Sequence, residues 1–577
     1  MVAGAAATAL VLGYLGLSRY LHDRGNYPSS PVDLLYYDIQ LFVLSSPPVD
    51  DGGSFPIFLQ IARFSAPAVT IYAVIEAARR LFGSELARLR TRRARHHHVV
   101  CGDDEVADAL AARLVREGRL VVRVVQQDGV CSDDPRPYVV VGDPTRAAVL
   151  RAAGVQRAST VYACTSDSAV NLAIALAVSE FPRRRRSVLE VHVQIDDPHM
   201  CLALQARRLG APPLPRLQVN FFSSHELAAR NLLAVQPVPV PVDRAPRLMI
   251  VGAGAFATAL AVELARSWRL QDPMQRYPLD LTFLGTGAVA VAAGLRRHNP
   301  LLVDACDVTS TDVDLDALLD SQPPEAQPDR VYLCGEDEEE AFRLALTLEH
   351  VWHRGPCSVV VRLNRLGLLR RAFHDQNGCR LLDDGSGALY LYDAVRAGSR
   401  PRLVEDSLME RLGRAIHENY VAARLRDGVG WGETRAMRPW SQLAEELKAE
   451  NRDQAADVGR KLKAIGCALG PSSSGGRPEE LDQDAVETLA RMEHQRWCDH
   501  RRDAGWRYGP RRDDLLRVHP DLVDWVTLAE HSREKDRQAV RHLPAFLSAA
   551  GFQIFTLPRA GTPVNAGRER PATVDSA

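Results

Sequence analysis

The pattern of apolar and polar positions divides the chain of 577 residues into three stretches. Residues 1–78 contain two long apolar runs separated by a mixed segment. From 97 to about 400, short runs rich in Val alternate with amphipathic segments, which is the pattern of strands and helices in a parallel sheet. From about 405 onward the apolar residues recur at helical spacing. A chain of this length is predicted to form several domains rather than one core.

The two apolar runs predict an N-terminal membrane helix hairpin over 1–82. Residues 1–18 carry no charge and nearly cross a hydrocarbon core of about 30 Å, with Arg19 snorkelling at the end. A signal peptide is the alternative, but the run lacks a basic start and a small-residue cleavage site. The second run, 55–78, is the weaker candidate, because its uncharged part, 64–75, is short enough for a buried or interfacial helix. It is interrupted by Gln60, Arg63, Pro67 and Glu76.

A basic segment after the second run favours the membrane interpretation. Between Arg79 and Arg95 there are seven arginines and one acid, Glu85. Such a cluster marks the cytoplasmic side of a membrane, although a solvated basic helix is the alternative. The prediction is a juxtamembrane linker over 83–96, a hairpin in the inner (plasma) membrane with the lipid bilayer as partner, and the bulk of the chain in the cytoplasm.

The mixed segment between the runs is short and amphipathic, and its position resembles that of the pore hairpin in two-helix potassium channels. A selectivity filter of the TVGYG kind is absent, and "SSPPVDDGG" (45–53) stands in its place. A degenerate pore and a plain membrane anchor therefore both stay open.

Bulk composition and motif searches narrow the function classes. The net charge of −1 argues against a nucleic-acid partner. The ten cysteines form no Cys-x-x-Cys pair, so a zinc site or disulfide framework is not expected and a reducing cytoplasm is. The "HHH" at 96–98 lacks metal-ligand spacing, and no catalytic motif is found. Tyr162 and Tyr332 fall inside predicted strands and are expected in the core. The chain is predicted not to be an enzyme.

The central stretch predicts two Rossmann-type α/β domains, over 97–234 and 247–400, joined by the Pro-rich segment "VQPVPVPVDRAPR". "VYACTSDSAVNLAIALA" from Val161 matches "VYLCGEDEEEAFRLALTLE" from Val331, which indicates an internal duplication. In the first half, strands are expected at 97–101, 120–125, 138–143 and 160–165, and helices at 105–118, 146–154 and 171–181.

Each half begins with a Gly-led turn between its first strand and first helix. In the G-x-G-x-x-G/A fingerprint the second Gly lets the backbone approach a pyrophosphate, which sits on the helix N-terminus. Gly252, Gly254 and Ala257 fit this pattern in the second half. Gly285 stands there where an acid would bind the ribose. The second half is therefore the favoured nucleotide-binding half.

The first half departs from the fingerprint at the second Gly. Gly102 and Ala107 are kept, but Asp104 puts a carboxylate where a phosphate would approach. The acid expected after the second strand is displaced to Asp128, with Gln126 in its place. A domain that pairs without binding any nucleotide is the alternative for both halves.

Two blocks of the first half, "HHVVCGDDEVADALAARL" and "VVVGDPTRAAVLRAAGVQRASTVYACTSDSAVNLAIALA", resemble the regulator-of-potassium-conductance family (RCK, or TrkA-N). The resemblance spans about 97–380. It implies cytoplasmic Rossmann domains that pair and bind nucleotide or ions to regulate a membrane partner. Further polar contacts to a ligand in this half are expected from Gly142, Asp143, Thr165, Asp167 and Asn171.

The C-terminal stretch contains a second duplication. Residues 412–420 match 489–497, and 440–466 match 525–551 at identical spacing. The second copy, with "EHQRWCDHRRDAGWRYGPRRDD" and "HPDLVDWVTLAEHSREKDRQAV", resembles the ryanodine-receptor (RyR) repeat, a small helical interaction module. The prediction is a degenerate repeat over 405–469, an RyR repeat over 480–557 and a disordered tail over 558–577.

Aromatic and basic residues gather in the second copy and suit a nucleotide-like anion through stacking and phosphate pairing. The alternative is that the aromatics form the core of the repeat and the arginines a solvated face. The candidate ligand-binding residues are His494, Trp497, Trp506, Arg507, Tyr508, Arg511 and Trp525.

These observations predict a membrane-anchored, nucleotide-sensing regulatory protein of the RCK type, which forms homo-oligomers and binds NAD or another adenine nucleotide. One alternative is a membrane-associated NAD-dependent oxidoreductase, for which no general acid can be named. The other is a non-conducting signalling or defence effector gated by a nucleotide messenger.

Overall fold

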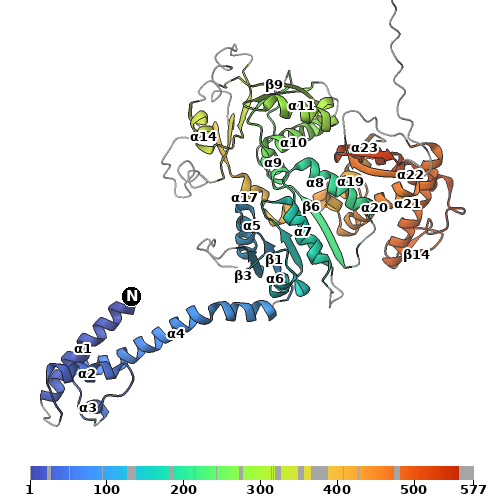
Figure 1. The fold of residues 1–577 in the computed structure, drawn as a ribbon. Helices are drawn as coiled ribbons and strands as arrows, with labels where there is room; N and C mark the ends of the chain where they lie inside the picture. Colours follow the sequence, from blue (N-terminus) through green and yellow to red (C-terminus); the bar gives the residue numbers. More distant parts are fainter. Residues whose placement is uncertain are drawn as a thin grey trace, which may run out of the picture. The chain divides into compact units, whose positions relative to one another are not determined.

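A computed structural model describes most of the chain, which forms two compact units, Met1–Arg93 and Ala94–Ala577 (Figure 1). The described residues are 2–22, 27–50, 52–93, 95–126, 138–181, 188–211, 214, 216–241, 243–271, 277–313, 315, 318, 327–347, 357–364, 387–406, 408–426, 428–472 and 481–557. The predicted disordered tail and Asp128 lie outside them.

The N-terminal unit is helical, with α1 Val2–His22, α2 Pro31–Leu41, α3 Pro47–Asp50 and α4 Ile57–Arg93. Helix α2 starts at Pro31 because Ser30 and Asp33 form a capping box, each side chain accepting from the other residue's backbone N–H. Helix α1 packs against both α2 and α4. A Cβ on Gly16 would lie 2.5 Å from the backbone nitrogen of Leu59, so this glycine permits the close crossing of α1 and α4.

Part of α4 meets the requirements for a membrane span. Within the described residues, the segment Ile57–Ala77 is long and apolar enough to cross a bilayer by length and composition. The sequence pattern ranked this run second, because Arg63 and Pro67 interrupt it. The helix nevertheless continues through Pro67. In the described part of the chain it is the one segment that meets these criteria, so the structure supports one span where the sequence predicted two, and that span is not the first-ranked run, 1–18.

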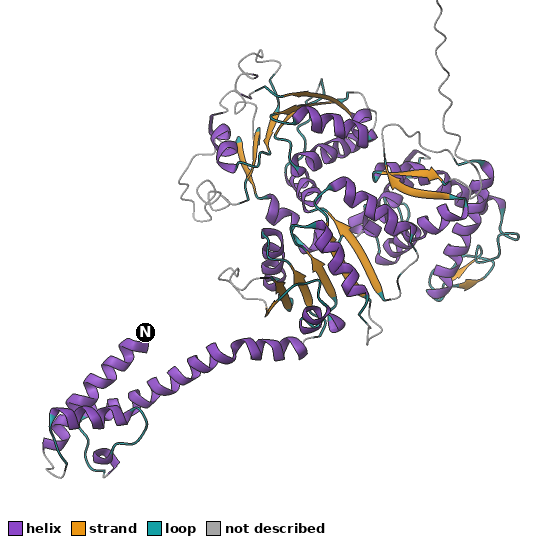
Figure 2. Cartoon of the chain, in the orientation of Figure 1, coloured by secondary structure: helices purple, strands orange, loops and turns teal. Residues whose placement is uncertain are grey.

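The second unit contains two six-stranded parallel sheets, as the sequence predicted (Figure 2). The first has the order β3-β2-β1-β4-β5-β6 and the second β9-β8-β7-β10-β11-β12, so both follow the Rossmann order. The strands of the first are β1 His98–Cys101, β2 Val121–Val125, β3 Tyr138–Val141, β4 Thr160–Ala163, β5 Leu189–Gln194 and β6 Leu217–Phe222. Those of the second are β7 Arg247–Val251, β8 Leu279–Leu284, β9 Cys306–Thr311, β10 Arg330–Leu333, β11 Val359–Arg362 and β12 Leu389–Tyr392.

Helices connect these strands and cover the sheets. In the first half they are α5 Glu105–Arg116, α6 Ala147–Ala152, η1 Val155–Arg157, α7 Ser168–Ser179, α8 Pro198–Gly210 and α9 Ser224–Val235. In the second they are α10 Ala255–Gln271, α11 Ala288–His298, α12 Pro300–Ala305, α14 Glu338–Thr347, α17 Ala394–Gly398 and α18 Pro401–Val404. Helix α7 begins earlier than the expected 171 because the Asp167 side chain caps it.

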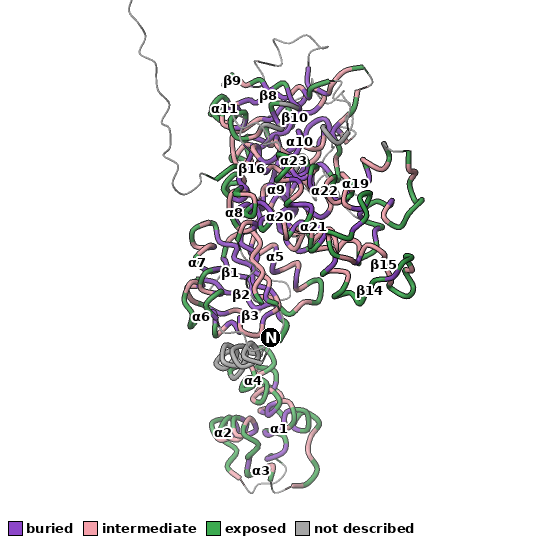
Figure 3. Tube along the Cα trace, turned by 90° about the vertical axis from the view of Figure 1, so that its right-hand side faces the viewer, coloured by how far each residue is buried: buried purple, intermediate pink, exposed green. Residues whose placement is uncertain are grey.

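The inner strands β1, β2, β4, β10 and β11 are buried along almost their whole length (Figure 3), whereas the outer strands β3, β6 and β9 are partly exposed. Tyr162 and Tyr332 are 0% exposed, which confirms that they belong to the core. The hydroxyl of Tyr162 donates to Glu405, which follows α18. His97 of the "HHH" run faces the carbonyl oxygen of Ala153 at 2.9 Å. In the described part of the chain, no group of three or more His, Cys, Asp or Glu could hold a metal ion.

The two halves exchange helices. Helix α9 follows the first sheet in sequence, but Ala228 and Leu232 pack with Leu260 of α10 in the core of the second half. Helix α18 follows the second sheet, but Val404 packs with Leu110 of α5 in the first half. Helix α17 lies beside both α5 and α9 (Figure 1). The two halves are therefore joined by packed helices.

The C-terminal region is mainly helical, as predicted, but it also contains short strands. Its elements are α19 Leu408–Arg426, η4 Trp440–Gln442, α20 Glu445–Ala464, β13 Cys467–Pro471, α21 Gln483–Asp503, β14 Arg507–Tyr508, β15 Val518–His519, α22 Glu530–Arg541, α23 Leu543–Ala549 and β16 Phe552–Thr556. Strands β13 and β16 pair antiparallel, with Leu469 opposite Ile554. Each closes one of the two sequence repeats, so the repeats share a two-stranded sheet.

Candidate functional site

The Gly-led turn of the first half lies between β1 and α5, at the point where the strand order reverses. A Cβ on Gly102 would lie 2.0 Å from the carbonyl oxygen of Cys164, so this position requires glycine. Asp104 is the N-cap of α5, and its Oδ1 accepts a hydrogen bond from the backbone of Ala107 at 2.8 Å. The carboxylate thus occupies an N–H group that a phosphate would need.

The electrostatics of this first turn also disfavour an anion. Burial raises the pKa of Asp104 to about 6, and the nearby carboxylates of Asp196 and Asp103 add to the effect. The buried cation beside the turn, Arg123, donates to the carbonyl oxygen of Gly102 and pairs with Asp108. Its charge is therefore already neutralised by the protein.

The other candidate residues of the first half stabilise the loops in which they lie. Gly142, with φ of +149°, follows β3. Asp143 accepts from the backbone and hydroxyl of Thr145, and Asp167 caps α7. Thr165 and Asn171 hydrogen-bond to each other through backbone and side chain. These side chains are explained by loop structure without a ligand.

The Gly-led turn of the second half is more open. Gly252, with φ of +114°, approaches the backbone of Cys334, and Ala257 is fully buried where α10 packs on the sheet. A Cβ on Gly254 would meet Oε1 of Glu336 at 2.6 Å, which is the far end of an exposed side chain. The first turn of α10 contains no acid, so its N-terminus is available to an anion.

A buried cation accompanies this second turn. Arg362 ends β11, and its side chain is 10% exposed. Its guanidinium lies 5.8 Å from the ring of Phe256, and one nitrogen is 3.2 Å from Oε1 of Glu336. The Nε atom of Arg362 has no hydrogen-bond partner. Within the described residues, the second turn thus combines close backbone approach, a helix N-terminus with no acid in its first turn and a positive charge, with the Glu336 carboxylate beside them.

Sequence reasoning did not find Arg362 or Glu336. Arg362 ends the run "SVVVR", and Glu336 lies in the acidic run that follows β10. The sheet order brings the ends of β10 and β11, and with them Glu336 and Arg362, beside the turn. This order is not visible in the local sequence. Gly285 follows β8 as expected, so no carboxylate stands at that position.

In the RyR repeat, three of the candidate residues lie together. The ring of His494 is 6.1 Å from that of Trp497 and 5.7 Å from that of Trp525. Both nitrogens of His494 face acceptors, Nδ1 the carboxylate of Asp536 and Nε2 the carbonyl oxygen of Val523. Burial lowers the pKa of His494, but these hydrogen bonds outweigh it and raise the pKa to about 10. His494 is therefore a charged structural residue.

Trp506 belongs to a neighbouring cluster. Arg501 lies over the rings of Trp506 and Trp497, at 4.9 Å and 5.6 Å, and both rings contact His519. Arg501 also pairs with Glu450 of α20 at 2.9 Å. This aromatic cluster therefore joins the two repeats. The remaining candidates, Arg507, Tyr508 and Arg511, are exposed at β14 and after it.

The two repeats share their internal contacts. Trp440 donates to Glu410 at 2.9 Å, and Trp525 donates to Glu487 at 3.1 Å. His417 faces a backbone carbonyl at 2.8 Å, as His494 does. The same two acids pair with an arginine from the following helix, Arg452 in the first repeat and Arg537 in the second. The aromatics therefore have structural roles in both copies.

Comparisons with known proteins agree with the motifs. Among solved structures, GsuK bound to ADP is 16% identical, with 70% of this chain and 95% of that chain covered and a TM-score of 0.35. GsuK bound to NAD is 14% identical, with 85% and 88% covered and a TM-score of 0.35. The dipicolinate synthase A chain from Bacillus subtilis is 10% identical, with 58% and 97% covered and a TM-score of 0.20. Family models match a TrkA-N domain at 98–211 and an RyR domain at 478–556, so the chain contains both.

Proposed function

We propose that this chain is a nucleotide-sensing regulatory protein of the RCK type, in which NAD or another adenine nucleotide binds at the second Gly-led turn. The observation that carries the proposal is the position of Arg362, a buried cation whose Nε atom has no partner, beside the turn at Gly252 and Gly254. A pyrophosphate requires a close backbone approach, a helix N-terminus and a positive charge. The first turn offers Asp104 instead.

The signal begins with an exchange of anions on Arg362. A bound pyrophosphate takes the place of the Glu336 carboxylate, which turns outward into solvent. The resulting shift of α10 is passed to α9, which packs on it, and so to the first half. The chain of the first half leads back through β1 to the segment that follows α4 in sequence. Nucleotide occupancy would thereby act on the N-terminal helices.

The N-terminal helices are the output of this proposal. We place them in the plasma membrane with the large unit in the cytoplasm, on the strength of the apolar segment Ile57–Ala77 and the arginine cluster after it. Homo-oligomers are the expected assembly. The helices act either as an ion-conducting segment or as an anchor for a membrane partner.

A second candidate function is favoured by the aromatic cluster of Trp497, Trp506 and His519. In this alternative the RyR repeat binds a nucleotide messenger by base stacking, and Arg501 exchanges Glu450 for a phosphate. The chain is then a messenger-gated effector, and the Rossmann-type halves pair without binding a nucleotide.

Calorimetry on the full-length protein in detergent with NAD, NADH, ATP and ADP separates these functions. The proposal expects a saturable site that Gly254→Asp removes and Asp104→Gly leaves within about twofold in affinity. Binding that survives Gly254→Asp but is lost in Trp506→Ala favours the repeat as sensor. A number of binding sites per chain that neither Gly254→Asp nor Trp506→Ala reduces would overturn both assignments.

A further inference from the structure

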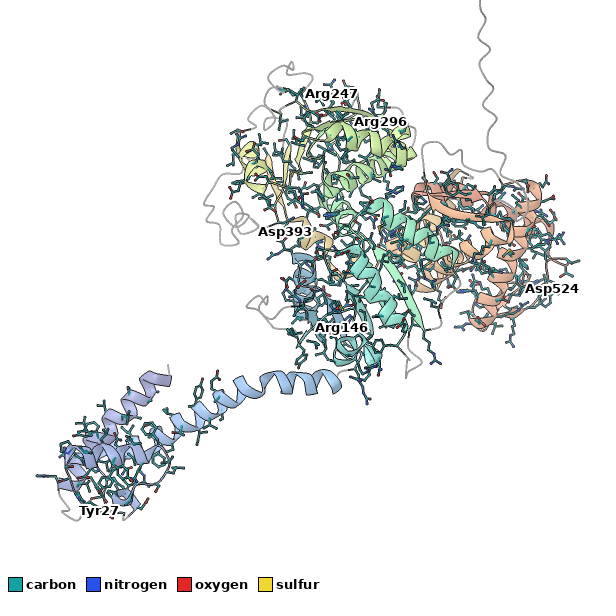
Figure 4. All side chains as sticks on the ribbon, in the orientation of Figure 1. Tyr27, Arg146, Arg247, Arg296, Asp393 and Asp524 are labelled. Atoms are coloured by element: carbon teal, nitrogen blue, oxygen red, sulfur yellow. The ribbon has the colours of Figure 1, made fainter. Side chains whose placement is uncertain are left out.

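A cleft of about 650 Å³ lies between the two Rossmann-type halves. Helix α5 of the first half forms one wall, and the ends of β11 and β12 with α17 form the other. Figure 4 labels Asp393, which caps α17 at this junction. Neither Gly-led turn lines the cleft. Its volume is within the range of about 300–1,000 Å³ that small-molecule sites occupy.

Polar groups without partners gather on the second wall. The hydroxyl of Ser399 is buried, with the residue 1% exposed, and makes no hydrogen bond. Among the described residues, the side-chain oxygen of Asn364 and the Nε of Arg400 also lack hydrogen-bond partners, and all three residues line the cleft. Buried polar groups are nearly always hydrogen-bonded in native proteins. Three exceptions on one wall point to a ligand that completes their bonds.

The charges of the cleft select an anion. Three carboxylates line it and all are engaged: Asp108 pairs with Arg123, Asp393 caps α17 and pairs with Arg396, and Glu105, on the first turn of α5, also has a partner. In contrast, Arg116 and Arg400 have no carboxylate partner in the described part of the chain. Guanidinium groups bind phosphate through paired hydrogen bonds. The cleft therefore presents two uncompensated cations from opposite walls.

An aromatic surface completes the site. Tyr390 of β12 lines the cleft, half-buried, and its ring lies 6.4 Å from that of Tyr392. Such a ring provides a stacking face for a planar base. We infer that this inter-half cleft is a second ligand site, which binds a nucleoside phosphate with its phosphate on Arg116 and Arg400 and its base on Tyr390.

Such a ligand would connect the two halves directly. Arg116 belongs to α5, and Arg400 follows α17, so one phosphate would hold both helices. The inference adds a site beyond the proposed function and does not require the second Gly-led turn to bind. The two sites can be removed separately.

The test is calorimetry on the full-length protein with ADP, pyrophosphate and adenosine, in wild type and in the Gly254→Asp background. The inference expects ADP to bind Gly254→Asp with one site per chain. Arg400→Gln and Arg116→Gln should each weaken that site about tenfold or more, as loss of a charge-assisted hydrogen bond does. Ser399→Ala removes no internal hydrogen bond, so it keeps the fold, and it should weaken ADP binding about threefold to tenfold. Arg402→Gln, at an exposed arginine that does not line the cleft, is the matched control.

The possible outcomes separate the cleft from the turn. Binding that is sensitive to Arg400→Gln but not to Gly254→Asp supports the cleft and refutes the turn. Binding that is abolished by Gly254→Asp refutes the cleft and supports the turn. The inference is also overturned if ADP binds the Gly254→Asp variant with an affinity that Arg400→Gln, Arg116→Gln and Ser399→Ala do not change. It is overturned as well if ADP does not bind at all.

Discussion

A Cβ atom added to Gly254 would lie 2.6 Å from Oε1 of Glu336, so the carboxylate of Glu336 reaches the place where a phosphate would approach the second Gly-led turn. Glu336 is 75% exposed, and its one ion pair among the described residues is with Arg362, at 3.2 Å. The protein thus supplies its own anion to a cation that a nucleotide would use. The structure therefore predicts a competition between Glu336 and the ligand for Arg362.

The first prediction is that Glu336→Gln tightens nucleotide binding. Removing the competing charge should lower the dissociation constant for ADP by about fivefold, since exposed charge interactions contribute ~1 kcal/mol or less. Arg362→Gln should weaken binding instead. Isothermal calorimetry measures both, with Glu339→Gln, an exposed acid on α14, as the control. Unchanged or weaker binding in Glu336→Gln would show that the carboxylate does not compete.

The second prediction concerns Glu226, a buried acid at the junction of three regions. It pairs with Arg230 of α9, Arg266 of α10 and Arg411 of α19. Burial raises the pKa of Glu226, but the three arginines outweigh it and lower the pKa to about 2. Glu226→Gln leaves Arg411 without a carboxylate partner in the described part of the chain, whereas Arg230 and Arg266 keep Glu263. The substitution should lower the free energy of unfolding by about 3 kcal/mol.

The pH dependence of this network follows from the lowered pKa. The stabilisation is full above the ordinary pKa of 4.5 and is lost as pH falls toward about 2. The gap in melting temperature between wild type and Glu226→Gln should therefore narrow from pH 6 to pH 3. Glu340→Gln, which breaks an exposed pair with Arg343, is the control and should leave the melting temperature nearly unchanged. A difference in melting temperature between wild type and Glu226→Gln that is constant with pH would contradict this account.

The alternation of apolar runs and amphipathic segments predicted both sheets, because buried parallel strands are short, nearly continuous apolar runs. The Val-rich stretches near Val100, Val122 and Val161 could belong only to such strands. The match between Val161 and Val331 gave the duplication, and the strand orders of the two sheets agree with it. Local sequence therefore predicted the four strands and three helices named for the first half, with errors of a few residues at their ends.

Features that depend on distant pairing were not predictable. Strands β13 and β16 are five residues each, and Leu469 meets Ile554 only after a whole repeat intervenes. Arg362 reaches the second Gly-led turn because β11 lies beside β10, which no local pattern encodes. The residues that carry the proposed site were for this reason missing from the sequence-based candidates, whereas Gly252 and Gly254 were among them.

The third prediction is a loss of stability in the RyR repeat at alkaline pH. The pKa of His494 is raised from 6.5 to about 10, so the stabilisation is present below pH 6.5 and is lost as pH rises through 10. Asp536→Asn removes the anionic partner, and the first repeat carries Asn451 at the matching position. The stability gap between wild type and Asp536→Asn should close between pH 7 and pH 10, as measured by chemical unfolding followed through tryptophan fluorescence. A gap that widens with pH would refute a charged His494.

The last prediction concerns the N-terminal unit, where Gly13 of α1 faces Asp38 of α2. Asp38 is 0% exposed, and neither carboxylate oxygen has a hydrogen-bond partner. A Cβ on Gly13 would lie 1.8 Å from Oδ1 of Asp38, so Gly13→Ala should destabilise the unit by about 1–3 kcal/mol through overpacking. Adding Asp38→Ala should recover most of that loss, because it removes both the clash and an unpaired polar group. Gly4→Ala is the control on the same helix, with nothing within 4 Å of the added atom. Circular dichroism during denaturant titration measures the free energy of unfolding of wild type, both single variants and the double variant. If the two single effects simply add in the double variant, α1 and α2 do not contact each other at this pair.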